Sequence, residues 1–322
     1  MINLYRTSLA VALALTSHLA AAQADKFPTK PIQAIISTAA GSASDVIMRY
    51  VGNEATKTLE QPFVIVSKAS TTGVIAADFV RRAAPDGYTI LLAGNTIMAA
   101  NKFLLKSLSY DPLKDFEPVS LVTLNPLVLV VRSDLPIKSV AELVAYGKAR
   151  PGQMNYGIGN AGGRVAVQLL KSAAGIEAQD VAFSGTSQAM LELVAGRLDF
   201  MFVDPAVADA FIKQQKIRAL AVSSSVRLPS MPELPTMVEA GIQNYDYVSF
   251  TAIYAPRGTP KQVIDTLNAA FVKAIDSPDA QANFRRMGMI GKSSTPQALA
   301  EFNKEQIASW QQWVKQAGME AQ

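Results

Sequence analysis

The chain has 322 residues, of which 49% are hydrophobic, and it carries a formal net charge of +4. This length and composition allow two domains with large buried cores and exclude a disordered or fibrous chain. Lysine and arginine are scattered rather than clustered, so we expect no nucleic-acid partner.

Residues 1–24 are typical of a secretory signal peptide. Arg6 precedes an apolar run at 9–15, and the AAAQA sequence at 20–24 offers cleavage sites after Ala22 or Ala24. The run is shorter than the ~20 residues that span a bilayer, and no later stretch comes close. A retained anchor helix is the alternative. We therefore expect a secreted chain that is not embedded in a membrane.

The mature chain would contain neither cysteine nor histidine, because the single histidine, His18, lies within the expected signal peptide. Without cysteine, no lipid can be attached to a thiol and no disulfide can brace the fold. Ser-His-Asp triads, cysteine nucleophiles and zinc sites built on histidine or thiolate are excluded as well. Carboxylate, lysine and oxygen-ligated metal chemistry remain open, but no sequence motif predicts a metal site or a cofactor.

The first structural unit is a strand at 32–37, a loop of small residues, and a helix at 44–59. This order brings backbone N–H groups and hydroxyls to the positive end of the helix dipole, which suits an anion. The candidate binding residues here are Ala40, Gly41, Ser42, Ser44 and Asp45. Asp45 has a second interpretation, as a capping residue without ligand contact.

Strands at 63–67 and 88–93 and a helix at 74–82 continue this alternation of strand and helix. A further strand-to-helix connection at 94–96 adds Asn95 and Thr96 to the candidate residues. Another strand is expected at 118–124. Strands that alternate with helices indicate an α/β fold with a mostly parallel sheet.

After residue 126 the same alternation begins again, which indicates a second mostly parallel sheet. Strands are expected at 127–131, 154–158, 181–183, 199–202 and 217–223, with helices at 139–150, 165–174 and 187–195. Loops of small or polar residues follow the strands of this sheet. The candidate binding residues in these loops are Gly159, Asn160, Ala161, Gly162, Gly163, Arg164, Ser184, Thr186 and Asp204.

Residues 157–162 match the GxGxxG pattern of dinucleotide-binding loops. The next strand, however, lacks the acidic residue at its end that would hold a ribose, because Asp180 stands at its beginning. We therefore interpret the loop as an anion site. Arg164 either donates to a ligand carboxylate or is a solvated surface charge.

A strand at 248–255 returns the chain to the first sheet, and two helices follow, with Thr259 and Thr295 as their expected N-caps. Trp310 and Trp313 fall on one face of the last helix, where packing is a simpler role than ligand stacking. The predicted division is a signal peptide at 1–24, one lobe from 25–126 and 248–322, and a second lobe from 127–247. A ligand cleft would lie between the lobes.

Several sequence blocks resemble the substrate-binding proteins of tripartite tricarboxylate transporters, also called the Bug family. The blocks are FPTKPI at 27–32, APDGYT at 84–89, YDPLKDFEPVS at 110–120, RALAV at 218–222, and LPT at 234–236 with EAG at 239–241. The similarity covers nearly the whole mature chain. It implies a two-lobed, type II-like periplasmic binding fold that closes on small carboxylates.

In this family, the loop after the first strand and the matching loop of the second lobe hold one ligand carboxylate, together with ordered waters. The first loop is similar to the family's PGGSxD motif but reads AGSASD, so Gly41, Ser44 and Asp45 correspond to it. The second loop puts Arg164 near the place of a family histidine. The third family loop is mostly lost at 68–76. An arginine in the cleft would favour a second carboxylate, as in a dicarboxylate or an aromatic diacid.

The sequence therefore predicts a monomeric, non-enzymatic periplasmic protein that captures a small carboxylate and meets membrane transporter subunits transiently. Two alternatives remain open at this point. One is a ligand-dependent sensor for a membrane receptor. The other is a carboxylate- or lysine-dependent hydrolase or lyase, which two carboxylates within catalytic reach of each other would favour.

Overall fold

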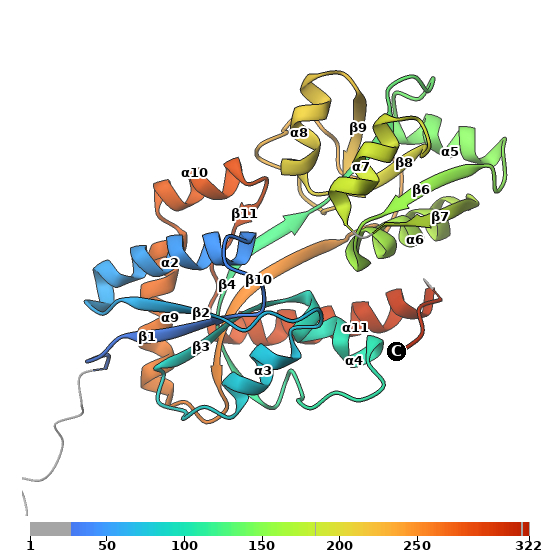
Figure 1. Ribbon diagram of the computed structural model, residues 1–322. Coiled ribbons are helices and arrows are strands. Elements are labelled where there is room, and N and C mark those ends of the chain that lie inside the picture. The colour runs from blue at the N-terminus through green and yellow to red at the C-terminus, as the bar shows by residue number, and fades with distance from the viewer. Residues whose placement is uncertain (1–26, 184, 317, 322) are drawn as a thin grey trace, which may run out of the picture.

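The computed structural model describes residues 27–183, 185–316 and 318–321. The predicted signal peptide at 1–24 lies outside these residues. Figure 1 shows two halves, each a sheet flanked by helices, with β4 (Phe116–Pro126) and β10 (Val248–Pro256) running toward the junction between them. The ligand site has to be sought where these two strands leave the first half.

The first sheet has six strands in the order β11-β4-β10-β3-β1-β2. Its other strands are β1 (Ile32–Ile36), β2 (Phe63–Ser67), β3 (Thr89–Gly94) and β11 (Ile290–Gly291). β1 pairs in parallel with β2 and β3, whereas β10 is antiparallel to β3 and β4. The carboxyl ends of β1, β3 and β4 consequently meet at one edge of the sheet.

Helices cover both faces of this sheet. α2 (Ala43–Leu59), α9 (Lys261–Ile275) and α10 (Pro278–Arg286) pack on the face that carries Ile36 and Leu92. The opposite face, with Ile35 and Leu91, is covered by α3 (Val74–Arg81), the π-helical segment η1 (Thr96–Ala100) and the start of α11 (Pro296–Gln316). The short α4 (Asn101–Leu104) follows η1. Neighbouring residues of a strand face opposite layers because side chains alternate across a sheet.

The second sheet has five strands in the order β7-β6-β8-β5-β9. They are β5 (Val128–Arg132), β6 (Met154–Ile158), β7 (Ala178–Ala182), β8 (Phe200–Val203) and β9 (Ile217–Val222). The helices on one face are α5 (Val140–Lys148) and α6 (Ala161–Ala174), and on the other α7 (Thr186–Val194) and α8 (Pro205–Lys213). The predicted two-sheet α/β fold is confirmed. Each sheet is mixed, because β5 and β10, which enter from the other half, run antiparallel to their neighbours.

The two connections between the halves are tied together by Ser223. Its N–H donates to the Leu127 carbonyl at 2.8 Å, and its hydroxyl accepts from the Leu127 N–H at 2.8 Å. The same hydroxyl donates to the Tyr247 carbonyl at 2.6 Å, and the Ser223 carbonyl accepts from the Tyr247 N–H at 2.8 Å. The chain segments that leave and re-enter the first half are therefore held side by side.

The last helix, α11, packs against both halves. Leu299 near its start is buried with the first sheet, whereas Ile307, Trp310 and Trp313 belong to the buried cluster that contains Tyr156 of β6. Both tryptophans are at most 9% exposed. The packing role predicted for them is confirmed, and their buried cluster includes residues of both halves, such as Ala99 and Tyr156.

Several local expectations differ from the structure. β7 spans Ala178–Ala182 rather than the predicted 181–183, so Asp180 lies inside the strand instead of at its beginning. α6 begins at Ala161 instead of residue 165, because the Asn160 side chain accepts from the Gly163 N–H at 2.8 Å and so caps the helix early. Thr259 does not cap α9; its hydroxyl donates to the Pro256 carbonyl, and Pro260 occupies the cap position. The polar helix α10 was not expected, since its buried face consists of only Ala280 and Phe284.

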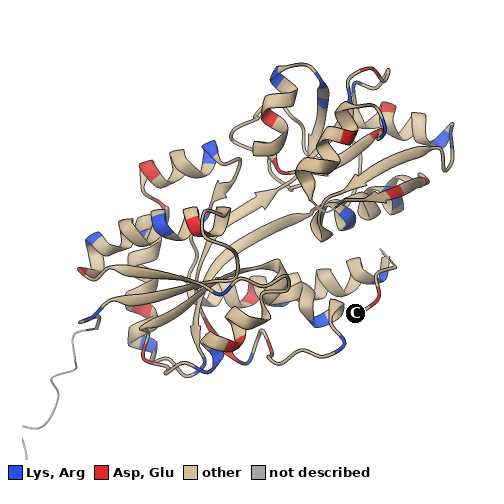
Figure 2. Ribbon diagram, in the orientation of Figure 1, with Lys and Arg blue, Asp and Glu red and all other residues tan. Residues whose placement is uncertain are grey.

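The surface carries its charges in a dispersed pattern. In Figure 2, lysine and arginine are spread over both halves, and acidic residues are interspersed among them. Within the described part of the chain, no helix has both the length and the apolar character needed to cross a bilayer.

Candidate functional site

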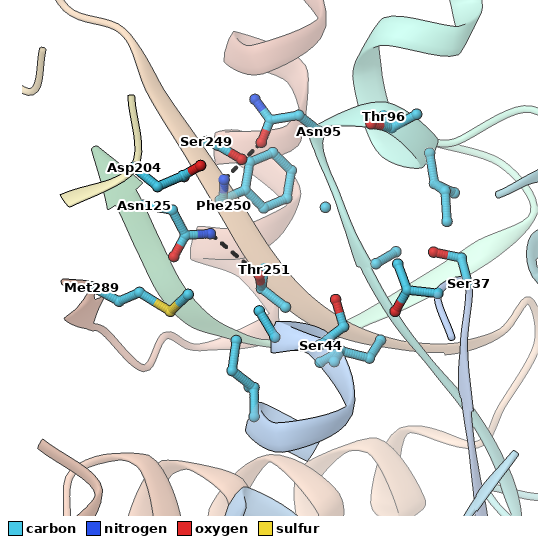
Figure 3. A pocket seen from close by; sticks show the side chains of 17 residues that line it. Ser37, Ser44, Asn95, Thr96, Asn125, Asp204, Ser249, Phe250, Thr251 and Met289 are labelled. Carbon is cyan, nitrogen blue, oxygen red and sulfur yellow. Dashed lines mark hydrogen bonds between the residues drawn. The ribbon is translucent and has the colours of Figure 1, made fainter. Parts of the chain in front are cut away.

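A cavity of about 290 Å³ lies at the edge of the first sheet, near the ends of β1, β3 and β4 (Figure 3). The loop after β1, the start of α2, the end of β3 and part of β10 form its walls, and one residue reaches it from the second half. The polar side chains that line it are those of Ser37, Thr38, Ser44, Asn95, Thr96, Asn125, Asp204, Ser249 and Thr251. Small hydroxyl and amide groups of this kind suit a small polar ligand.

The first turn of α2 offers unpaired hydrogen-bond donors to this cavity. Ser42 caps the helix by accepting from the Asp45 N–H at 3.4 Å. Among the described residues, nothing accepts from the N–H groups of Ala43 and Ser44, and both residues line the cavity. These two N–H groups lie at the positive end of the helix dipole, where an anion is stabilised.

Asp45 is buried behind this turn and holds it in shape. Its Oδ2 accepts from the Gly41 N–H at 2.8 Å and from Arg49 Nε at 3.1 Å, and its Oδ1 lies 3.1 Å from Arg49 Nη2. The Gly41 N–H, followed by the Arg49 guanidinium, lowers the pKa of Asp45. Asp45 therefore ties the loop at Gly41 to α2 and does not line the cavity, whereas the cap of the helix is Ser42.

Asn95 extends the pairing of β3 with β10 past the last residue of β3. Its Oδ1 accepts from the Phe250 N–H at 2.6 Å, and its Nδ2 donates to the Val248 carbonyl at 3.4 Å. The side chain is 6% exposed. Asn95 thus borders the cavity, but its amide is used mainly to position β10.

Replacing Asn95 with alanine should therefore lower the free energy of unfolding by about 1–3 kcal/mol, the cost of leaving a buried donor such as the Phe250 N–H unpaired. Urea denaturation followed by circular dichroism measures this loss. Asn283→Ala, which removes a half-buried amide on the surface of α10, is the control and should change stability by less than about 0.5 kcal/mol. Equal losses in the two variants would contradict the role given to Asn95.

Asp204 is the contribution of the second half to this cavity. It follows β8 and occupies the N-cap position of α8, although its side chain makes no capping hydrogen bond. In Figure 3 its carboxylate points toward Ser249 and lies beside Asn125. Burial raises the pKa of Asp204, and only its own backbone N–H opposes that effect.

A larger cavity of about 1240 Å³ lies between the halves on the other side of Thr96. From the first half it is lined by Thr71, Thr72, Asn101 and residues 104–106, and the end of the chain borders it at 318–321. The second half contributes Ile158, Gly159, Asn160, Ala161, Arg164, Ala182 and Phe183. Thr96 lines both cavities, so the two spaces adjoin.

The loop after β6 is shaped by close packing against the start of α7. A Cβ atom on Gly159 would lie 2.3 Å from the Thr186 Cα, so no larger residue fits there without moving backbone. Asn160 Nδ2 also donates to Thr186 Oγ1 at 3.2 Å. Gly162 lies against the Tyr247 hydroxyl, which a Cβ would approach to 2.5 Å. Close packing at Gly159 and Gly162 and the hydrogen bond of Asn160 therefore fix the position of this loop.

Arg164 lies at the rim of the larger cavity and has an acidic neighbour. Its Nη2 is 3.6 Å from Asp180 Oδ2 on β7, and its side chain is 35% exposed. Both predicted roles remain compatible with this position. The structure does not bring Arg164 to the cavity that contains the α2 donors.

The candidate residues predicted from sequence fall into three groups. The smaller cavity is lined by Ser44, Asn95, Thr96 and Asp204. The larger one is lined by Thr96, Gly159, Asn160, Ala161 and Arg164. Lining neither are Ala40, Gly41, Ser42, Asp45, Gly162, Gly163 and Thr186, which shape or support the loops. Ser184 lies outside the described residues.

Other lining residues were missed by the sequence reasoning. Ser37 and Thr38 end the first strand, and Asn125, Ser249 and Thr251 lie where β4 and β10 approach the junction of the halves. A usable signal was present, because polar residues interrupt both apolar strands at the predicted crossovers. The pattern of small-residue loops that open helices does not include these strand positions.

Comparison with known proteins gives a consistent result across the chain. The family described as "Tripartite tricarboxylate transporter family receptor" matches residues 47–319. A protein of Pseudomonas sp. (strain P51), the "UPF0065 protein in tcbD-tcbE intergenic region", is 32% identical over 313 residues, which cover 96% of this chain and 93% of that protein.

Two solved structures show the same architecture. "R. palustris Rpa4515 with adipate" superposes with a TM-score of 0.77 at 29% identity, covering 92% of this chain and all of that one (100%). The periplasmic binding protein BugD superposes with a TM-score of 0.73 at 30% identity, covering 92% of this chain and 100% of BugD. The two-sheet fold is therefore shared with these proteins.

Proposed function

The chain belongs to the tripartite tricarboxylate transporter receptor family, and from this premise we propose that it captures a small carboxylate and delivers it to a membrane transporter of that type. Members of this family are substrate-binding proteins rather than enzymes. The hydrolase and lyase alternatives are accordingly not retained. Adipate, which accompanies the R. palustris neighbour, is a carboxylate of the proposed size.

The observation that carries the proposal is the pair of unpaired N–H groups of Ala43 and Ser44 at the cavity. A ligand carboxylate can accept from both groups, and the helix dipole adds a favourable field at the same point. Hydroxyls of Ser37, Thr38 and Ser44 surround them. A carboxylate bound there would replace water with fixed donors, which is how anions are commonly held at helix N-termini.

Capture would involve closure of the two halves on the ligand. We take residues 25–126 and 248–322 as one lobe and 127–247 as the other, with the Ser223 bonds at the junction. Donors on α2 belong to the first lobe, and Asp204 belongs to the second. A ligand that contacts both lobes binds the closed form more tightly than the open one, and this difference in affinity drives closure.

Delivery would take place in the periplasm. We propose that residues 1–24 direct secretion and are then removed, and that the mature chain acts as a monomer. The closed form would meet the transporter subunits transiently. Recovery of transporter subunits in a ligand-dependent pull-down would support this role, whereas recovery of a signalling receptor would favour the sensor alternative.

A thermal-shift screen of mono- and dicarboxylates, amino acids and neutral sugars tests the proposed function. A ligand that binds only the folded state stabilises it by about 2.7 kcal/mol at 100 times its Kd, so its melting temperature must rise. We expect at least one carboxylate to raise the melting temperature. Stabilisation by neutral sugars but by none of the carboxylates would overturn the proposal.

Removing one backbone N–H at the start of α2 tests whether the carboxylates found in the screen bind to the α2 donors. Proline is well tolerated at the first position of a helix and has no N–H, and Ser42 before it already has the extended backbone that proline requires (φ −69°, ψ 166°). Ala43→Pro should therefore fold normally but weaken carboxylate binding about tenfold or more, as expected for one charge-assisted hydrogen bond. Ala43→Ser keeps the N–H and is the matched control.

A further inference from the structure

The smaller cavity has opposite electrostatic character at its two sides. The α2 side presents N–H donors of the first lobe, as described above. The other side presents the carboxylate of Asp204, which is the single ionisable group among the described residues that line the cavity. No lysine or arginine of the described chain lines it. A second ligand carboxylate placed there would meet a negative charge rather than a positive one.

Asp204 also has no cationic partner within the described part of the chain, since none of its ion pairs includes this residue. The lysine on the same helix, Lys213, pairs with Asp209 at 2.7 Å, and the arginine nearest the α2 turn, Arg49, pairs with Asp45. A partly buried carboxylate without a counter-ion is costly, and a cation brought by the ligand would offset that cost. Burial raises the pKa of Asp204, as expected for such a group.

A second acceptor lies beside Asp204. Asn125 Oδ1 is buried and has no hydrogen-bond partner, while its Nδ2 donates to Thr251 Oγ1 at 3.4 Å. Asn125 belongs to β4, so this acceptor is fixed by the first sheet whereas Asp204 approaches from the second half. Figure 3 shows the two side chains next to each other at one side of the cavity. Both side chains therefore add acceptors rather than a cation to this side of the cavity.

We propose that Asp204 determines specificity by binding an ammonium-type group at the end of the ligand opposite its carboxylate. The ligand class is thus an amino-carboxylate, and diacids are disfavoured. This inference rests on the proposed function, because the carboxylate end of the ligand is taken to lie at α2. The sequence suggested that Arg164 selects between ligand classes. Its guanidinium, however, faces Asp180 at the larger cavity, so the inference gives the selecting role to Asp204.

Calorimetric titration with matched acids tests the inference. The probes are butanoate and hexanoate, 4-aminobutanoate and 6-aminohexanoate, and succinate and adipate. For at least one chain length, the unmodified protein should bind the amino acid at least tenfold more tightly than the diacid. Asp204→Asn should reduce or reverse that ratio by at least tenfold, chiefly by weakening the binding of the amino acid.

Two further variants keep the result interpretable. Asp204→Ser retains a residue suited to the N-cap of α8 and should give the same loss of selectivity if Asp204→Asn fails to fold. Asp209→Asn removes a carboxylate from the same helix at a site away from the cavity and should leave the ratio unchanged. Binding of monocarboxylates with a ratio that Asp204→Asn does not alter would overturn the inference alone. Failure of the unmodified protein to bind any of the six acids would also overturn the inference, whereas the proposed function is overturned only by the outcome of the thermal-shift screen given above.

Discussion

Replacing Trp310 with alanine is expected to lower the free energy of unfolding by about 3–5 kcal/mol, the usual cost of removing a buried tryptophan side chain. Trp310 is 2% exposed, and its ring lies 5.7 Å from that of Trp313, which in turn lies 5.2 Å from the Tyr247 ring. The three rings join α11 to the segment that leads into β10. Since a domain is stable by only about 5–15 kcal/mol, a loss of this size would be a large fraction of the total.

Denaturation by urea, followed by circular dichroism, measures the change. Tryptophan fluorescence gives a second, local measurement, because Trp310 and Trp313 are the two tryptophans of the sequence and both lie on α11. Trp310→Phe is the matched control: it keeps an aromatic ring and removes the indole Nε1, which is buried without a partner. We expect it to cost less than about 1.5 kcal/mol. A loss below 1.5 kcal/mol for Trp310→Ala as well would show that α11 does not hold the two halves together.

The position of α11 illustrates which parts of the fold the sequence could predict. Its apolar stripe and the Thr295 cap predicted a helix, and Thr295 Oγ1 does accept from the Ala298 N–H at 3.1 Å. The stripe also predicted that both tryptophans are buried. It could not show that the first turns pack on one sheet and the later turns on the other, because periodicity identifies a buried face but not the element that covers it.

For the strands, too, the hydrophobic pattern predicted their positions but not their partners. Apolar, β-branched runs located the strands to within a few residues, including β2 and β6, whose predicted limits agree with the structure. Strand direction was less accessible, since the antiparallel placement of β5 and β10 depends on where the chain crosses between halves. The helix α10 is polar overall and buries only Ala280 and Phe284, so its local signals were the Ser277 cap, Pro278 after it and the charges at its two ends.

The candidate site was predictable in its location but not in the roles of its residues. Small-residue loops between strand and helix predicted candidate residues, of which the structure brings Ser44, Asn95 and Asp204 to one cavity. Whether a polar side chain faces the cavity depends on its partners. Asp45 is occupied by Gly41 and Arg49, whereas Asp204 has no ion-pair partner in the described chain. Whether a carboxylate has an ion-pair partner depends on distances in the folded chain, which residue spacing in the sequence does not give.

Replacing Gly94 with alanine is expected to disrupt the floor of the smaller cavity, with a loss of about 3 kcal/mol or more, at the top of the range for overpacked cores. A Cβ atom at this position would lie 2.2 Å from the Phe250 carbonyl oxygen. That oxygen belongs to backbone, so no change of rotamer can relieve the contact. β10 would have to move away from β3, where Gly94 pairs with Thr251, and the bond from the Phe250 N–H to Asn95 would stretch.

The same movement should abolish carboxylate binding, because Ser249 and Thr251 on β10 line the cavity. Urea denaturation gives the stability, and titration with the acid that most raises the melting temperature gives the affinity. Gly163→Ala is the matched control, since its Cβ would lie 3.4 Å from the Phe202 carbonyl, an ordinary contact, and alanine suits a helix better than glycine by up to about 1 kcal/mol. If the two variants were equally stable, the close approach of β3 and β10 would not be what fixes the floor of the cavity, and the positioning role of Asn95 would lose its basis as well.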